Sequence, residues 1–271
     1  MIGFGVFFTI TAFVSAWAWS IIARFLTDNG GTELTGTYSA GYMLVTYFTT
    51  LLLSATDSEY YPRLSTVCHD KELTRQAVDS QAQAMLMLAA PLVICFIIAM
   101  PFVVYIVLEY EKFGNSIALA RLAVMGVFFK AVSIPVAYLP LSKSDPIVYV
   151  IQETLCYIFL ILCVMLGYNM WGITGVGLSL AVWEAISLLI VLSISRIRYG
   201  YVMSGKIVMQ FLIQCAFVVI VSTLSLCGGT IPVVVSILLL LASFTYTLYF
   251  FSRHTTFLSG LGKRIKGRFS R

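Results

Sequence analysis

Three charged side chains stand deep inside apolar stretches of the sequence: Lys130, Glu153 and Glu184. At a helical rise of about 1.5 Å per residue, Lys130 lies roughly 15 Å from the turn at Pro140, and Glu153 roughly 12 Å from Asp145. A charge at the centre of a membrane helix costs about 2.5–3.5 kcal/mol on insertion scales, so such a side chain needs a partner or water. We therefore predict that Lys130 approaches Glu153 or Glu184.

Two interpretations of these charges stay open from the sequence. Either they form a buried ion pair that only holds helices together, or they line a water-filled cavity and contact a polar substrate or a coupling ion. Arg24, just beyond the first apolar stretch, is either an interfacial anchor or a contact for an anionic head group. The candidate substrate-binding residues are thus Lys130, Glu153, Glu184 and Arg24.

The elements that must position these residues are apolar stretches separated by short polar breaks. Hydrophobic residues make up 60% of the 271 residues and charged residues 11%. These are too few polar residues to cover the surface of a water-soluble domain. A helix needs roughly 20 apolar residues to cross the hydrocarbon layer. Such segments occur at 2–22, 38–55, 84–108, 117–139, 146–166, 172–193, 207–226 and 231–251. The sequence predicts an all-α, polytopic membrane helical bundle with about eight transmembrane helices.

Basic residues are distributed unequally over the connections between these segments. One alternate set of connections, together with the carboxyl-terminal tail, holds thirteen Lys and Arg residues, whereas the other set holds only Arg24, Lys112 and Arg121. By the positive-inside bias, both termini are expected in the cytoplasm. The polar stretches 27–36 and 167–172 are then outer connections, and the stretch after Pro62 is expected to form a short interfacial helix on the cytoplasmic face.

The sequence lacks the residue patterns that metal, nucleotide or nucleic-acid binding would need. The two histidines, His69 and His254, are far apart, and the six cysteines form no CxxC pair, so no metal site is expected. The sequence has no Walker loop and no Gly-rich nucleotide fingerprint, so we expect no cofactor. The loop and tail positions of the basic residues explain the net charge of +5 without nucleic acid as a partner.

Small and amide residues indicate how the helices pack. Gly172, Gly175 and Gly177 bring small residues together on one helix, which allows another helix to come close. Gln210 and Gln214 are one turn apart and share a face, where interhelical hydrogen bonds are expected.

Four short motifs occur in an order that resembles a known family. They are Gly36-x-Tyr38-x-x-Gly41, then Tyr61-Pro62-Arg63-Leu64-Ser65, then a Lys143/Asp145/Pro146 turn followed by Tyr149 and Glu153, and finally Trp171-Gly172-x-x-Gly175-x-Gly177. Together they resemble the later half of polysaccharide flippases, especially O-antigen translocases, of the multidrug/oligosaccharidyl-lipid/polysaccharide exporter superfamily. The resemblance covers essentially the whole chain, and the Pro-Arg-Leu-Ser segment is its most specific part.

The resemblance implies one lobe of a MATE-like two-lobe transporter plus two extra helices. The chain then divides into a six-helix lobe (1–194), a cytoplasmic linker (195–206), an additional two-helix hairpin (207–252) and a basic cytoplasmic tail (253–271). The implied substrate is a polyprenyl-diphosphate-linked oligosaccharide, moved across the bacterial inner membrane for O-antigen or other surface polysaccharide synthesis. Lys130 and Arg24 are the implied diphosphate contacts. Besides this substrate and membrane lipids, the expected partner is a missing first lobe or a second copy, because the chain corresponds to a truncated carboxyl-terminal part.

Two other functions stay open. A cation-coupled multidrug exporter of the same superfamily would use Glu153 and Glu184 as proton or Na⁺ sites. A membrane-embedded polysaccharide-assembly enzyme would need catalytic groups clustered on a sizeable loop. The short outer loops, and the lack of His within the apolar segments, count against an enzyme.

Overall fold

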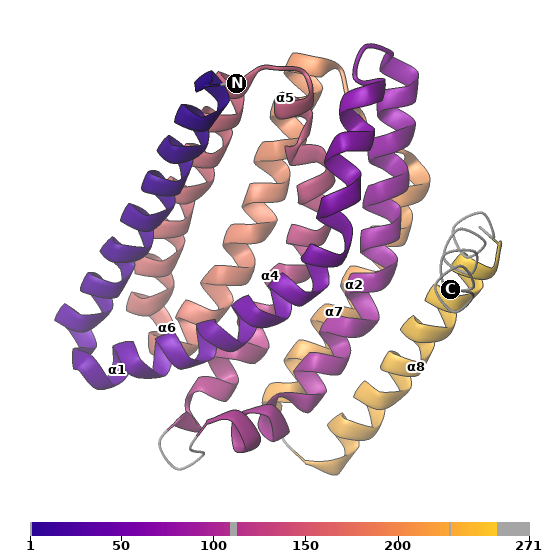
Figure 1. Ribbon diagram of the computed structural model, residues 1–271. Coiled ribbons are helices and arrows are strands. Elements are labelled where there is room, and N and C mark those ends of the chain that lie inside the picture. The colour runs from indigo at the N-terminus through magenta and orange to yellow at the C-terminus, as the bar shows by residue number, and fades with distance from the viewer. Residues whose placement is uncertain (1, 109–112, 228, 254–271) are drawn as a thin grey trace, which may run out of the picture.

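The computed structural model describes residues 2–108, 113–227 and 229–253, and nearly all of them are helical (Figure 1). The helices are α1 (Ile2–Val67), α2 (Lys71–Val107), α4 (Ser116–Ala137), α5 (Leu139–Ser142), α6 (Pro146–Tyr199), α7 (Gly205–Cys227) and α8 (Thr230–Arg253). Within the described ranges no strand is present, and six of the helices are long and apolar enough to cross a membrane. The prediction of an all-α polytopic bundle is confirmed.

Two of the six long helices turn back on themselves. In α1 the turn lies at Gly31, whose φ of 73° and ψ of −177° favour glycine. In α6 it lies at Trp171 and Gly172, where Gly172 has φ 59°. Each helix therefore has a first and a second limb: residues 2–30 and 32–67 in α1, and 146–170 and 173–199 in α6. The described helices thus provide eight apolar limbs, one for each predicted segment.

The two connections that the sequence analysis assigned to the outer side are much shorter than predicted. The stretch 27–36 stays helical except at Gly31. Its polar side chains bond to carbonyls of their own helix: Thr27 Oγ1 donates to Ala23 O and Asn29 Nδ2 to Phe25 O, each at 2.8 Å. These bonds let a polar sequence remain helical up to the turn.

The predicted interfacial helix after Pro62 is also wrong. Helix α1 continues through Pro62 to Val67, and α2 begins at Lys71. Asp70 caps α2, because its Oδ1 accepts hydrogen bonds from the backbone N–H groups of Glu72 at 2.8 Å and Leu73 at 3.0 Å. The polar stretch is therefore shared between two long helices rather than forming a helix of its own.

The turns of the bundle lie at two opposite ends (Figure 1). The turns at Gly31 and at Trp171–Gly172 lie at one end with the α7–α8 connection, and the α1–α2 turn and α5 lie at the other. Among the described turns, those of the two sets that differ in basic residues are thus separated in space. The positive-inside bias can orient a bundle only when its basic connections lie at one end, as they do among these turns. Which end of the bundle faces the cytoplasm stays a prediction.

Reporter fusions test that assignment. We expect fusions after Ser144 and Gly205 to be active in the cytoplasm, and fusions after Gly31 and Gly229 to be active outside, because basic connections are retained inside. Alkaline phosphatase and green fluorescent protein, fused in parallel at each position, give opposite readouts and so control for expression. A phosphatase signal at Ser144 would reverse the proposed orientation.

Glycines allow close helix packing, as the small-residue pattern predicted. A Cβ on Gly177 would lie 2.6 Å from the carbonyl O of Leu119 in α4, and one on Gly175 would lie 2.0 Å from the carbonyl O of Gly167. The second limb of α6 can therefore pack backbone to backbone against both α4 and the first limb of α6. Helix α4 is largely buried as a result.

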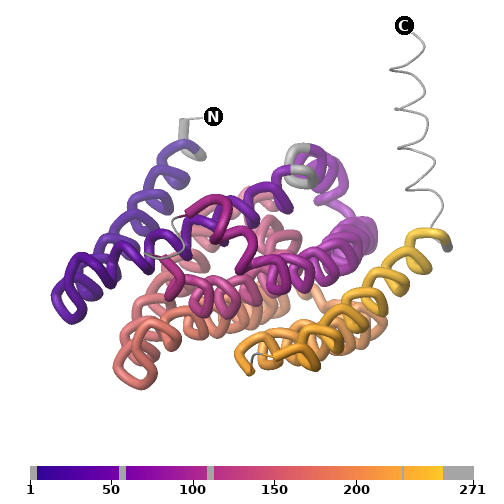
Figure 2. Tube along the Cα trace, turned by 90° about the horizontal axis from the view of Figure 1, so that it is seen from below, coloured from indigo at the N-terminus to yellow at the C-terminus, as the bar shows by residue number. Residues whose placement is uncertain are grey.

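Helices α7 and α8 lie side by side at one flank of the bundle (Figure 2) and are joined to it by polar contacts. Gln83 Nε2 donates to Gln210 Oε1 at 2.7 Å, and Thr247 Oγ1 donates to Met87 O at 2.8 Å. Between the two helices, Ser243 Oγ donates to Gln214 Oε1 at 2.8 Å. The expected interhelical hydrogen bonds of both glutamines are thus confirmed.

Candidate functional site

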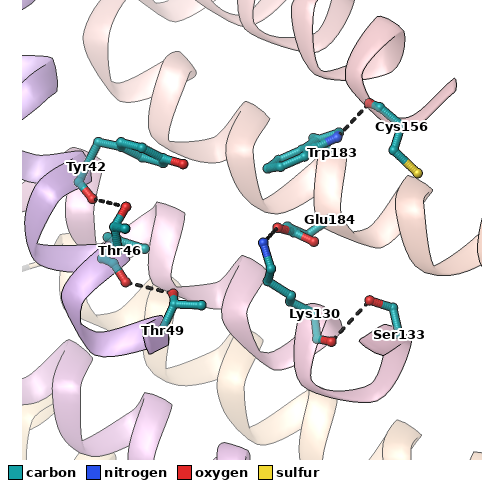
Figure 3. Close-up of polar contacts among 9 residues, drawn as sticks. Tyr42, Thr46, Thr49, Lys130, Ser133, Cys156, Trp183 and Glu184 are labelled. Atoms are coloured by element: carbon teal, nitrogen blue, oxygen red, sulfur yellow. Dashed lines mark hydrogen bonds and ion pairs between the residues drawn. The ribbon is translucent and has the colours of Figure 1, made fainter. Parts of the chain in front are cut away.

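Lys130 of α4 and Glu184 of α6 form an ion pair, with Lys130 Nζ 3.1 Å from Glu184 Oε1 (Figure 3). The Lys130 side chain is 36% exposed and that of Glu184 is 11% exposed. Gly126, one turn before Lys130, makes room for the pair: a Cβ there would lie 3.1 Å from Glu184 Cγ and 3.2 Å from Leu180 O. The prediction that Lys130 meets one of the two glutamates is confirmed.

The other two candidates, Glu153 and Arg24, differ in their position relative to this ion pair. Glu153, on the first limb of α6, is half-buried and close enough to Lys130 and Glu184 to interact with both electrostatically. Arg24 is exposed on the first limb of α1 and does not line the cavity that contains the pair. The structure therefore gathers Lys130, Glu184 and Glu153 in one region and leaves Arg24 outside it.

The ion pair lines a cavity of about 360 Å³ between the second limb of α1, α4 and the second limb of α6. The α1 wall is a stripe of hydroxyls from Thr46, Thr49, Thr50 and Ser54. Thr46 Oγ1 donates to Tyr42 O at 2.9 Å, and Thr49 Oγ1 donates to Val45 O at 2.7 Å. Because their protons are used within the helix, these oxygens can accept hydrogen bonds from a ligand.

Two aromatic side chains, Tyr42 and Trp183, also line the cavity, next to aliphatic residues. Trp183 Nε1 donates to Cys156 O at 2.7 Å, which fixes the indole next to the ion pair. Lys130 Nζ lies 5.7 Å from the centroid of the Trp183 ring, a cation–π distance. Trp19 contacts both Trp183 and Tyr42, with ring centroids 6.0 and 4.5 Å apart. The cavity thus combines a cation, a carboxylate, hydroxyl acceptors and aromatic faces.

Most of this wall was missed by the sequence analysis, which singled out charges alone. Thr46, Thr50 and Ser54 recur every four residues in an apolar segment, so they share one helix face, and this polar stripe was a usable signal. Trp183 and Tyr42 carried no such signal. Their place at the cavity follows from the way that α1 and α6 fold back on themselves.

The fold is a polytopic helical bundle, and two comparisons show what it resembles. Residues 1–117 match the model of a family described as "Polysaccharide biosynthesis protein". A solved structure described as "Lipid II flippase MurJ, inward closed conformation" is similar over 87% of this chain and 52% of its own, with a TM-score of 0.59 and 13% identity. No curated protein matches the chain.

The family match supports the resemblance to polysaccharide-biosynthesis proteins over residues 1–117, and the solved structure shows that the fold is similar to that of a flippase. The chain spans about half the length of the flippase that it matches. At 13% identity the likeness concerns the fold, so the substrate must be argued from the cavity.

Proposed function

We propose that this chain is one lobe of a transporter that moves a polyprenyl-diphosphate-linked oligosaccharide across the bacterial inner membrane, with both termini in the cytoplasm. The observation that carries the proposal is the Lys130–Glu184 pair at the wall of a cavity that also offers hydroxyls and aromatic rings. A lipid-linked saccharide carries an anionic diphosphate next to many sugar hydroxyls. Each of these groups has a counterpart in the cavity.

Lys130 is the diphosphate contact in this proposal. Its ammonium group has three N–H donors, and Glu184 accepts one hydrogen bond from it. With 36% of the side chain exposed, the remaining donors are available to a phosphate oxygen. Glu184 would then keep the cation in place when the cavity is empty, and the hydroxyl stripe would accept hydrogen bonds from the sugar.

A second body completes the transporter. Alternating access moves one repeat against another around a central site, and the chain corresponds in length to about half of the matched flippase. We propose that a first lobe, or a second copy of this chain, supplies the opposite cavity wall. Among surface polysaccharides, O-antigen units are the proposed cargo, because the motif order resembles O-antigen translocases most closely.

Complementation tests this assembly. Expressed alone in a strain that lacks its O-antigen flippase, the chain should not restore surface O-antigen on a lipopolysaccharide gel, because a single lobe has nothing to move against. Co-expression with a matching first lobe should restore it. Full rescue by the chain alone would instead favour a homodimer, which crosslinking would then reveal.

One observation favours a cation-coupled exporter as the second candidate, namely that Glu153 lies near both members of the ion pair. A second carboxylate within electrostatic reach of the ion pair is a candidate proton or Na⁺ site. Uptake into proteoliposomes separates the two functions. An exporter moves organic cations and stops with Glu153→Gln, whereas a flippase moves lipid-linked sugar and depends on Lys130.

A further inference from the structure

A second cavity, of about 200 Å³, is lined in part by α5. Helix α5 lies at the opposite end of the bundle from the turn of α1 (Figure 1). Its walls come from three parts of the chain: the start of α2, α5 with the turn after it, and the end of α6 with the residues that follow. It shares no lining residue with the cavity around Lys130. It is therefore a separate feature, to which the proposed transport assigns no role.

The lining of this second cavity carries an excess of positive charge. Lys71, Arg75 and Lys143 are its cations, and Glu72 is its single acidic residue. Glu72 Oε1 accepts a hydrogen bond from Gln76 Nε2 at 3.1 Å, so part of its acceptor capacity is used on its own helix. Arg75 approaches Asp79 through Nε at 3.9 Å, and that contact leaves the terminal N–H groups of its guanidinium available.

The walls are fixed by contacts that join distant segments. Lys143 Nζ donates to the carbonyl O of Cys68, which holds the turn after α5 against the end of α1. The Tyr201 hydroxyl donates to Asp79 Oδ1 at 2.6 Å, which holds the α6–α7 connection against α2. The cationic side chains are thus brought together by a preformed structure, unlike basic residues that are scattered along a surface.

We propose that this cavity binds a phosphate group, carried either by the head group of an anionic phospholipid or by a soluble phosphate. Lys and Arg donate charge-assisted hydrogen bonds to phosphate oxygens, and three of them converge here. A cavity of about 200 Å³ is large enough to admit a phosphate group. The cavity lies at the end of the bundle that carries the α1–α2 turn and α5, and Lys and Arg near a membrane surface attract anionic lipid head groups.

Native mass spectrometry of the purified chain with phosphatidylglycerol tests the site. Because K71Q/R75Q/K143Q removes three charge-assisted hydrogen bonds to the phosphate, it should lower lipid affinity by at least about fivefold per side chain, on the order of 100-fold in all. The matched control, R63Q/R196Q/K206Q, removes three charges at the same end of the bundle, and none of these residues lines the cavity. The control should bind lipid like the parent. Equal losses in both variants, or no loss in the cavity variant, would overturn the proposal.

A measurement on the parent protein guards against a cavity variant that fails to fold. Phosphatidylglycerol nanodiscs should protect Lys71 and Lys143 from acetylation, relative to phosphatidylcholine nanodiscs, and should leave exposed Lys206 reactive. In detergent, the same protection by inorganic phosphate alone would identify a soluble phosphate as the source. Protection of Lys206 to the same degree, or no protection by either phosphate source, would refute the site. The charge-retaining variant K71R/K143R should bind like the parent.

Discussion

If the chain acts as one lobe of the proposed two-lobe flippase, Lys130→Ala in the assembled protein should lower transport of lipid-linked oligosaccharide by about 10- to 100-fold, the range expected for a lost hydrogen bond to a charged group. Lys130→Arg should keep most of the activity, because it retains the positive charge. The measurement is translocation of lipid-linked sugar in proteoliposomes at equal protein content. Activity of Lys130→Ala equal to that of the parent would reduce Lys130 to a structural role.

The double variant Lys130→Ala/Glu184→Ala separates binding from folding. Lys130→Ala alone leaves the nearly buried Glu184 carboxylate without its partner, and breaking a buried pair costs about 3–5 kcal/mol, less here because Lys130 is partly exposed. Removing both charges should recover most of this stability, since an apolar replacement of a buried pair is often neutral. If Lys130 contacts the diphosphate, the double variant should be stable in thermal unfolding and still inactive. Recovery of transport together with stability would show that the pair only holds helices together.

Gly177→Ala should destabilise the bundle by about 1–3 kcal/mol, the usual range for an overpacked contact. The added Cβ would lie 2.6 Å from the carbonyl O and 2.8 Å from the Cα of Leu119. Because these are backbone atoms, no side chain can rotate away, and α4 has to move from α6. Thermal unfolding in detergent measures the loss, and transport should fall as well, since the same two helices carry Lys130 and Glu184.

Gly36→Ala is the matched control for this prediction. Gly36 also lies within a helix, but a Cβ there would meet nothing within 4 Å. Alanine in such a position typically stabilises a helix by about 0.5–1 kcal/mol relative to glycine. We therefore expect the two Gly→Ala variants to change stability in opposite directions. Destabilisation of similar size in both would contradict the packing argument.

The sequence predicted the fold well, because the main forces are local to each segment. The length of an apolar stretch is enough to predict a membrane helix. A single charge such as Lys130 predicts a partner, because an unpaired charge in the membrane interior has a high free-energy cost. The choice of partner was left open. Glu184 rather than Glu153 pairs with Lys130 because Gly126 lets the second limb of α6 come close, a fact that depends on two helices at once.

The turns and the aromatic wall escaped prediction for a related reason. Polar residues at 27–36 resembled a loop, although Thr27 and Asn29 satisfy their hydrogen bonds on their own helix. Trp183 is adjacent to Glu184 in sequence, yet its indole is fixed by the Cys156 carbonyl on the other limb of α6. Contacts of this kind form only after the helix has folded back, so the pattern of residues along the sequence cannot predict them.

The sequence separation of the ion pair has a consequence for biosynthesis. Lys130 and Glu184 are 54 residues apart, so α4 is made well before its counter-charge exists. At about 5–20 residues per second, roughly 3–11 s pass between synthesis of the two residues. During that interval α4 must enter the bilayer with a bare ammonium group, at a cost of about 2.5–3.5 kcal/mol, supported only by its apolar neighbours. Slower translation between Lys130 and Glu184 would lengthen the time for which this helix is open to membrane quality-control proteases.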